Sequence, residues 1–366
     1  MSKLRVAVVF GGRSAEHEIS LLSAQNVVAS LDPEKYEPVL IGIDREGRWF
    51  LNEGSLHLLD SQDAAKIRLS EDSTEVGLVS TGPSSHLVKN GGGELGKVDV
   101  LFPVLHGPYG EDGTIQGLAK LADIPCVGAG VLGSAVGMDK DVMKRLLRDA
   151  EIAVAPFLVA RAHRPTEPTY TEVSATLGPR LYVKPANLGS SVGISRVTNA
   201  AEYAAALEEA FAYDRKVIVE QEVRGREIEC SVLGNEEPVA SVPGEIVAGD
   251  GFYSYAAKYI DEHGAELCIP ADLTEAERAT VQDTAIAAFE ALCCEGMARV
   301  DGFLTPDGRF VVNEINTIPG FTRISMYPKL FEASGIGAFE LTDRLIRLAL
   351  DRHAAESRLR LTPRPE

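Results

Sequence analysis

Two short strands joined by a tight turn form the most constraining pattern in this chain. Arg299-Val-Asp301 precedes the turn Thr305-Pro-Asp-Gly308, and a strand ending in Glu314-Ile-Asn316 follows it. Because side chains alternate faces along a strand, Arg299 and Asp301 share one face, and Glu314 and Asn316 share another. The turn brings Asp301 within a residue or two of being opposite Glu314.

If the two faces coincide, two carboxylates, one amide oxygen and one guanidinium occupy a single patch. Oxygen ligands of this kind suit Mg²⁺, which keeps some waters and takes further ligands from substrate phosphates. A neighbouring arginine can stabilise charge on a transferring phosphoryl group. The alternative is a hairpin with an ordinary solvated charged face.

Charge and composition narrow the class of partner. A chain of 366 residues forms about two to three domains by the usual prior. Its 45% hydrophobic and 25% charged residues are typical of a globular protein. The net charge, 36 − 54 = −18, argues against a nucleic acid or an anionic membrane as partner. Nucleotide binding stays open, because it needs only local positive groups.

The cysteines and apolar runs indicate the compartment. Five cysteines show no C-x-x-C spacing and no nearby histidine cluster, so neither zinc nor a disulfide framework is indicated. This pattern fits a reducing compartment. The apolar run at 4–10 is too short for a signal peptide, and no stretch approaches the roughly 20 residues of a membrane span. We therefore expect a cytoplasmic protein.

The first part of the chain reads as an open α/β domain. A buried-strand pattern at 4–10 is followed by a Gly-rich loop, a helix to about residue 31, and a second strand at 36–43. Such a strand–helix–strand unit predicts parallel pairing. Short strands and loops are expected at 60–97, and a strand at 98–105 precedes a helix from 114 to about 122.

Two further regions follow. A helix at 140–150 leads to a strand ending at Lys184, and the Gly-rich Asn187-Leu-Gly-Ser-Ser-Val-Gly-Ile-Ser195 comes next. The third region starts near Val217 and carries the hairpin, and a helix at 338–354 closes the chain.

The loop after Lys184 combines a lysine at a strand end with backbone N–H donors and hydroxyls. That combination can cover a polyphosphate. No Gly-Lys-Ser/Thr follows, so a P-loop is not predicted. The alternative is a Gly-Ser hairpin with a surface lysine.

Three other features have a structural and a functional interpretation. Glu16 follows Gly11-Gly-Arg-Ser-Ala, which lacks the third glycine of a dinucleotide fingerprint. It either complements a helix dipole or receives a substrate ammonium. His106 either caps a loop or contacts substrate. The aromatic loop 249–259 is either a surface loop or a lid over a site.

The order of these motifs resembles the D-alanine–D-alanine ligases of the ATP-grasp superfamily over nearly the whole chain. The phrases Gly11-Gly-Arg-Ser-Ala-Glu-His-Glu-Ile-Ser20 and Lys184-Pro-Ala-Asn-Leu-Gly-Ser-Ser-Val-Gly-Ile-Ser195 are specific to that family. The hairpin alone identifies only the superfamily. The resemblance implies an N-terminal open parallel α/β domain at 1–128, followed by a two-lobed ATP-grasp fold. Its central lobe would span 129–219, and its C-terminal lobe, with the metal site, 220–366.

The resemblance also implies a role for each matching residue. ATP would be bound by Lys140, Lys184 and Lys258 at the phosphates, with Ser191, by Glu220 at the adenine and by Glu227 at the ribose. Two Mg²⁺ (or Mn²⁺) ions would be bound by Asp301, Glu314 and Asn316. Arg299 and the Gly320 N–H would stabilise the phosphoryl group and the tetrahedral oxyanion. Glu16 would hold the first D-alanine's ammonium near His106, Ser325 and Met326 would meet the second carboxylate, and Ser190, Tyr259 and Glu16 would link lid and substrates.

The implied reaction joins two D-alanines through an acyl phosphate, with release of ADP and phosphate, in a homodimer. One rival is an ATP-grasp ligase with another carboxylate or with D-lactate as acceptor. A second is a non-catalytic ATP-binding protein, which the presence of all four hairpin residues disfavours. A third is a Rossmann oxidoreductase.

Tyr259 generates a first prediction. Related ligases that make D-alanyl-D-lactate differ in the lid, and some place a histidine where Tyr259 stands, so tyrosine favours an amine nucleophile. We expect Tyr259→Phe to relax this choice, measured as D-alanyl-D-lactate formed from D-alanine plus D-lactate. Unchanged D-lactate use in the variant would count against this role.

Overall fold

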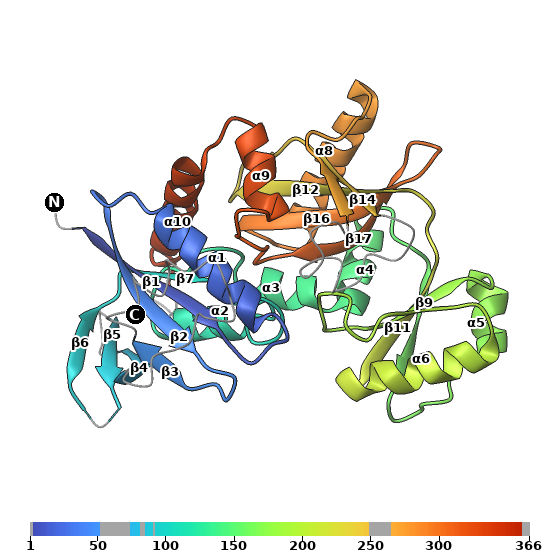
Figure 1. Cartoon of the computed structure of the whole chain (residues 1–366), viewed down its shortest axis with the longest axis horizontal. Helices are drawn as coiled ribbons and strands as arrows, with labels where there is room; N and C mark the ends of the chain where they lie inside the picture. The colour runs from blue at the N-terminus through green and yellow to red at the C-terminus, as the bar shows by residue number, and fades with distance from the viewer. Residues whose placement is uncertain (1–2, 52–73, 81–84, 91, 249–264, 361–366) are drawn as a thin grey trace, which may run out of the picture.

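Three β-sheets organise the chain in the computed structural model, which describes residues 3–51, 74–80, 85–90, 92–248 and 265–360 (Figure 1). The N-terminal sheet has seven strands in the order β6-β5-β4-β3-β2-β1-β7. Its strands are β1 (Leu4–Gly11), β2 (Tyr36–Ile43), β3 (Trp49–Leu51), β4 (Thr74–Ser80), β5 (Ser85–Lys89), β6 (Glu94–Lys97) and β7 (Val100–Pro103).

The predicted parallel unit is confirmed in this sheet. Strand β1 pairs in parallel with both β2 and β7, and helix α1 (His17–Ala29) connects β1 to β2. The apolar run of β1 is buried on both of its faces, as a central parallel strand requires. Within the stretch 60–97, where short strands and loops were expected, the described residues include β4, β5 and β6, which pair antiparallel at the far edge of the sheet. Residues 60–73, 81–84 and 91 of that stretch lie outside the described residues.

Three helices lead from this sheet to the next: α2 (Thr114–Leu121), α3 (Val131–Met138) and α4 (Lys140–Asp149). Helix α4 begins where Asp139 caps it, because the Asp139 carboxylate accepts the Val142 N–H at 3.0 Å. Met143 and Leu147 of α4 are fully buried in the core of the third sheet. Asp139 also forms an ion pair with Lys216 of the second sheet, so the first turn of α4 lies between the second and third sheets.

The second sheet has four strands in the order β10-β9-β11-β8. They are β8 (Phe157–Arg161), β9 (Leu181–Pro185), β10 (Ser195–Val197) and β11 (Lys216–Gln221), and α5 (Tyr170–Leu177) and α6 (Ala200–Tyr213) pack on them. Helix α5 starts at a capping box in which Thr169 and Glu172 exchange hydrogen bonds.

The third sheet is antiparallel, in the order β15-β14-β12-β16-β17, with β13 paired to β12. Its strands are β12 (Arg226–Gly234), β13 (Val239–Ala240), β14 (Gly244–Ala248), β15 (Ala265–Cys268), β16 (Gly296–Leu304) and β17 (Phe310–Asn316). Helix α8 (Glu275–Ala291) lies between β15 and β16, and α9 (Met326–Ala333) and α10 (Ala338–Glu356) follow β17, the last as predicted. The boundaries 128/129 and 219/220 stay predictions.

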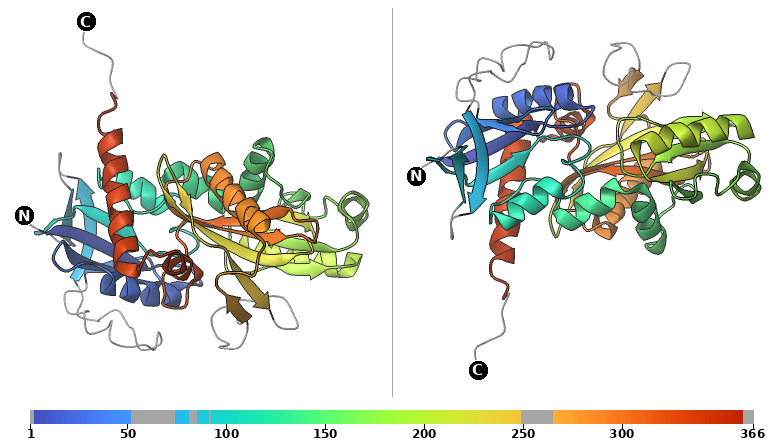
Figure 2. Two further views of the ribbon diagram at one scale, coloured as in Figure 1. Left: turned by 90° about the horizontal axis from the view of Figure 1, so that it is seen from above. Right: turned by 90° about the horizontal axis from the view of Figure 1, so that it is seen from below.

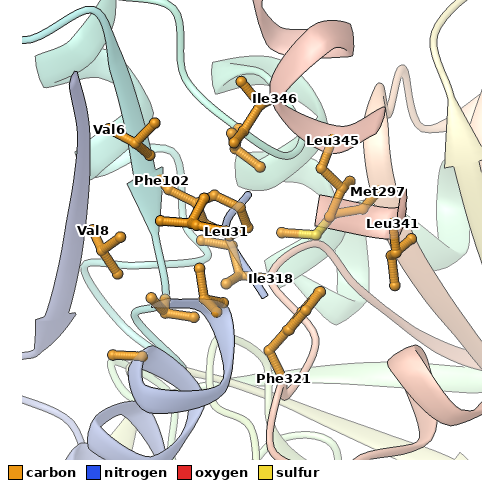
Figure 3. Packing of buried hydrophobic residues seen from close by; sticks show 14 of the residues in the cluster. Val6, Val8, Leu31, Phe102, Met297, Ile318, Phe321, Leu341, Leu345 and Ile346 are labelled. Atoms are coloured by element: carbon orange, nitrogen blue, oxygen red, sulfur yellow. The ribbon is translucent and has the colours of Figure 1, made fainter. Parts of the chain in front are cut away.

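One hydrophobic core joins the first and third sheets. Val6 and Phe102 of the N-terminal sheet pack in it with Met297 of β16 (Figure 3). Phe321, in the loop after β17, and Leu345 of α10 belong to the same core. Helix α10 lies between the two sheets in both views of Figure 2. The N-terminal sheet is therefore fixed against the third sheet by buried apolar surface rather than by a loose linker.

In the part of the chain that the structure describes, none of the helices combines the length and the apolar character needed to cross a membrane.

Two phenylalanines test this shared core. Phe331 of α9 is 1% exposed within the core, whereas Phe339 of α10 is 58% exposed. We expect Phe331→Ala to lower the free energy of unfolding by roughly 3–5 kcal/mol, because it leaves a cavity. Phe339→Ala should change it by about 0.5 kcal/mol or less. Urea unfolding of both variants measures this, and equal midpoints would contradict the shared core.

Candidate active site

The hairpin of β16 and β17 brings the four predicted residues onto one face. Arg299 lies opposite Asn316, and Asp301 lies opposite Glu314, in the antiparallel register. Residues opposite each other in such a pair point to the same side of the sheet. The two faces considered in the sequence analysis therefore coincide.

A β-bulge shifts the register directly beyond this patch. Asp301 pairs with Glu314, but the next residue, Gly302, pairs with Val312, so Asn313 is the extra residue. A bulge redirects side chains from regular alternation. Asn313 consequently reaches the second sheet, where its Oδ1 accepts a hydrogen bond from Lys184 Nζ at 3.0 Å.

Arg299 is held between two carboxylates. Its Nε and Nη2 each lie 2.7 Å from the two oxygens of Asp301, a bidentate arrangement. Its Nε is also 2.8 Å from Glu229 Oε2 on the neighbouring strand β12. Asn316 Nδ2 donates to Asp301 Oδ2 at 2.8 Å. The guanidinium position is thus fixed by β12 and β16 together.

Two of the predicted lysines converge on this face from other elements. Lys140, at the first turn of α4, donates from Nζ to the Leu188 carbonyl at 2.7 Å and lies 3.6 Å from Glu314 Oε2. Lys184, at the end of β9, forms an ion pair with Glu220 Oε1 besides its bond to Asn313. Both side chains are buried.

Glu220 of β11 receives a second lysine that the sequence analysis did not select. Lys144 of α4 places Nζ 3.1 Å from Glu220 Oε2, and both side chains are almost completely buried. Burial alone would raise the pKa of Glu220, but Lys144 and Lys184 together lower it to about 2. The carboxylate is therefore ionised at neutral pH.

The Gly-rich loop adopts a strained backbone. Ser190 and Ser191 have φ angles of 53° and 58°, the left-handed region that non-glycine residues rarely enter. A Cβ added to Gly189 would lie 3.7 Å from a carboxylate oxygen of Glu16. The loop therefore approaches Glu16, the residue that precedes α1, at Gly189.

His106 connects the N-terminal domain to the loop that follows β17. Its Nε2 is 3.0 Å from Ser23 Oγ of α1, and its Nδ1 is 3.0 Å from the Ile318 carbonyl. Ser23 Oγ also accepts the Phe321 N–H at 3.2 Å. Burial lowers the pKa of His106, against the opposing charge of Glu16. A neutral imidazole is therefore favoured.

Gly320 sits inside this tethered loop at a position where a side chain would collide. A Cβ there would lie 2.9 Å from Ser325 Oγ, the hydroxyl that accepts the Thr322 N–H at 3.0 Å. Ser325 stands at the N-cap position of α9 without a capping hydrogen bond from its side chain, and Met326 begins the helix. Glu227 lies on β12, opposite Phe303 of β16.

Two predicted residues, Lys258 and Tyr259, lie outside the described residues. The structure also adds residues that the sequence analysis missed: Glu111, Lys144, Glu229 and Asn313. Glu111 is in the loop after His106, and the Gly107 N–H donates to its Oε2 at 2.8 Å. Burial and then the charge of Glu16 raise the pKa of the Glu111 carboxyl to about 8.

Metal-ligand sets of three or more His, Cys, Asp or Glu side chains are absent from the described ranges. The predicted set of Asp301, Glu314 and Asn316 has only two carboxylates and one amide, so it cannot enclose a metal ion by itself. It suits an ion that shares its ligands with a bound phosphate. Mg²⁺ commonly takes one or two carboxylates and completes its shell with substrate phosphates and water.

Comparison with known proteins gives consistent matches over the whole chain. Family models described as the N-terminus and the C-terminus of D-ala D-ala ligase match residues 5–129 and 146–347. The D-alanine–D-alanine ligase A of Escherichia coli strain K12 is 51% identical over 99% of this chain and 100% of its own. That of Shouchella clausii is 51% identical over 98% of each.

Solved structures agree with the sequence matches. The D-alanine–D-alanine ligase from Coxiella burnetii has a TM-score of 0.85 at 40% identity and covers 97% of both chains. The VanG D-Ala:D-Ser ligase from Enterococcus faecalis has a TM-score of 0.86 at 36% identity, over 95% of this chain and 100% of its own.

Glu111 generates a pH prediction. Its carboxyl holds a proton in the folded state up to about pH 8, whereas in the unfolded chain it ionises near 4.5. Between these values the folded state binds the extra proton, so this group makes the free energy of unfolding fall as pH rises. Glu111→Gln keeps an acceptor for Gly107 but does not titrate. Its stability relative to the wild type should rise from about pH 4.5 to about pH 8 and then level off.

Urea unfolding at matched pH values measures this difference. Glu332→Gln, at an exposed position on α9, is the control, and its difference from the wild type should not follow the same curve. A pH-independent difference for Glu111→Gln would contradict the raised pKa.

Proposed function

The chain belongs to the D-alanine–D-alanine ligase family, and we propose how its residues divide the work of that ATP-dependent enzyme. It joins two D-alanines to D-alanyl-D-alanine for peptidoglycan synthesis, on an ATP-grasp fold. The family prediction is confirmed, and the oxidoreductase and non-catalytic alternatives are set aside. The observation that carries the assignment of roles is the hairpin register, which gathers Arg299, Asp301, Glu314 and Asn316 on one face.

We propose that ATP binds where the second and third sheets face each other. Lys140 and Lys184 would contact its phosphates, with Ser191 from the Gly-rich loop. Glu220 would contact the adenine and Glu227 the ribose. The described lysines support this arrangement, since Lys140 of α4 lies near Glu314 and Lys184 of β9 is hydrogen-bonded to Asn313, both on the hairpin. Buried ammonium groups at such a site attract the phosphates of a nucleotide.

Asp301, Glu314 and Asn316 would hold two Mg²⁺ or Mn²⁺ ions. Bound there, the ions would neutralise charge on the ATP phosphates during phosphoryl transfer. Arg299 lies beside Asp301 of this set, and both Asp301 and Glu229 contact its Nε. A fixed guanidinium stabilises developing charge without reorganising.

Glu16 would bind the ammonium of the first D-alanine and leave its carboxylate free to attack the γ-phosphorus. The P–O bond to ADP breaks, and an acyl phosphate forms. The amine of the second D-alanine, after losing a proton, attacks the acyl carbon, and phosphate leaves as the peptide bond forms. The Gly320 N–H would receive the oxyanion of the tetrahedral intermediate, in a loop that Ser23 and His106 anchor.

Ser325 and Met326 would meet the carboxylate of the second D-alanine at the start of α9, where no side chain caps the helix and the positive end of the helix dipole favours an anion. Water has to be kept from the acyl phosphate. We assign that task to the loop 249–259 with Lys258 and Tyr259, which connects the described strands β14 and β15.

We also propose a cytoplasmic homodimer. All five cysteines are free, which fits a reducing compartment. Light scattering of the purified chain measures the oligomeric state, and a monomeric mass would contradict the dimer. Limited proteolysis tests the domain division at 128/129 and 219/220.

An activity assay tests the assignment of roles. Mg·ATP with D-alanine should yield ADP together with D-alanyl-D-alanine. A coupled assay measures the ADP, and mass spectrometry identifies the dipeptide. L-alanine should give no dipeptide. ADP release without dipeptide would contradict the assigned acceptor site.

The metal assignment has a matched pair of variants in one hairpin. Glu314→Gln should lower kcat by roughly a hundredfold or more and leave the chain folded, because it removes an ionic ligand. Asp307→Asn, in the exposed turn between the same strands, should keep its activity. Full activity of Glu314→Gln would overturn the metal set.

A further inference from the structure

Lys144 is a buried cation to which the proposed mechanism gives no task. It lies on α4 with its side chain 1% exposed, and its ion pair with Glu220 is the only one that it makes within the described ranges. Its Nζ has no hydrogen-bond partner of good geometry there, although Glu220 Oε2 is 3.1 Å away. Burial lowers the pKa of the Lys144 ammonium, and the Glu220 carboxylate opposes that effect.

Such a pair is a weak source of stability. Desolvating two ions can cost more than their attraction returns, and apolar residues of similar size would often stabilise the fold as well or better. Two neighbouring residues of α4, Met143 and Leu147, pack in the core of the third sheet. An apolar residue would fit this pattern, so the charge needs another explanation.

Lys184 supplies that explanation. It now forms an ion pair with Glu220 and a hydrogen bond with Asn313. To contact phosphates it has to give up part of its interaction with Glu220. A buried carboxylate left without a cation is strongly destabilising. Without a second cation, Glu220 would therefore retain Lys184 and compete with ATP for it.

We propose that Lys144 is a positioning residue that keeps Glu220 charge-compensated while Lys184 turns to the ATP phosphates. The inference rests on the phosphate-binding role proposed for Lys184. Lys144 occupies the other oxygen of Glu220, so the carboxylate holds one cation throughout the exchange. Lys144 acts on the affinity for phosphate-bearing nucleotides and touches neither substrate nor the reacting atoms.

The ligand adenosine separates this role from a merely structural one. Adenosine lacks phosphates, so Lys184 need not leave Glu220 when adenosine binds. A structural defect in α4 would weaken ATP and adenosine alike. The loss of a compensating charge would weaken ATP alone.

The experiment measures the Kd of ATP and of adenosine by calorimetry, with Mg²⁺ and without D-alanine, on the full chain. Lys144→Met removes the charge and keeps the length of the side chain. We expect it to weaken ATP binding roughly tenfold or more and to change adenosine binding by about twofold or less. Lys144→Arg, which keeps the charge, should restore most of the ATP affinity. Equal weakening of both ligands, or no change in the ATP affinity, would overturn the proposal.

A second pair of variants keeps the test decisive if Lys144→Met folds poorly. Glu220→Gln removes the buried carboxylate, so Lys144 no longer has a charge to compensate. In that background Lys144→Met should leave the ATP Kd unchanged within about twofold, because the two residues act as a coupled pair. If Lys144→Met weakens ATP binding in the Glu220→Gln variant as much as in the chain that retains Glu220, the proposal is overturned.

Lys184→Met distinguishes failure of this inference from failure of the proposed function. If it weakens ATP but not adenosine, the phosphate role of Lys184 stands, and a null result for Lys144→Met overturns only the present inference. If Lys184→Met leaves the ATP affinity unchanged, the phosphate role fails and the inference falls with it.

Discussion

The site depends on one buried junction, where the N-terminal domain packs against the loop that follows β17 and is hydrogen-bonded to it. The core shared by the N-terminal sheet, Met297 and α10 fixes the two sheets against each other. Ser23 Oγ accepts the Phe321 N–H, Asn26 Nδ2 donates to the Phe321 carbonyl, and His106 is hydrogen-bonded to the Ile318 carbonyl. Gly320 lies between these anchored residues, so an N–H group of the third sheet's loop is positioned by a helix about 300 residues earlier in the chain. Packing provides the rigidity, and the hydrogen bonds provide the direction.

The second and third sheets meet through charge rather than apolar packing at the site. Lys184 of β9 reaches Asn313 of β17, and Lys140 of α4 reaches both the Gly-rich loop and Glu314. Polar contacts of this kind can exchange partners when a charged ligand arrives, whereas interdigitated apolar side chains cannot do so without leaving cavities. The molecule thus combines a fixed junction on the N-terminal side with an exchangeable one on the side of the second sheet.

Strand alternation and turn composition, which can be read from a short stretch of sequence, predicted the hairpin of β16 and β17. The period of two along a strand and the Pro-Asp-Gly turn brought Asp301 within a residue or two of being opposite Glu314, and the observed register pairs them directly. They could not reveal Asn313, because the bulge that redirects it depends on how two strands pair, not on the letters of either. Glu229 and Lys144 were missed because each meets its partner only after distant segments pack together. Glu111 lies five residues after His106, which the sequence had singled out, but its raised pKa comes from burial and from the charge of Glu16, which spacing does not encode.

The left-handed serines carry one more consequence. Each non-glycine residue in that region costs about 1–3 kcal/mol, and glycine would adopt the same backbone freely. Glycine already occupies positions 189 and 193 on either side of Ser190 and Ser191, so the loop tolerates it nearby. Serine at both strained positions therefore lowers the free energy of unfolding relative to glycine. The side-chain hydroxyl is what serine adds over glycine at this cost, so a change of both serines to glycine would release the backbone strain and remove both hydroxyls at once.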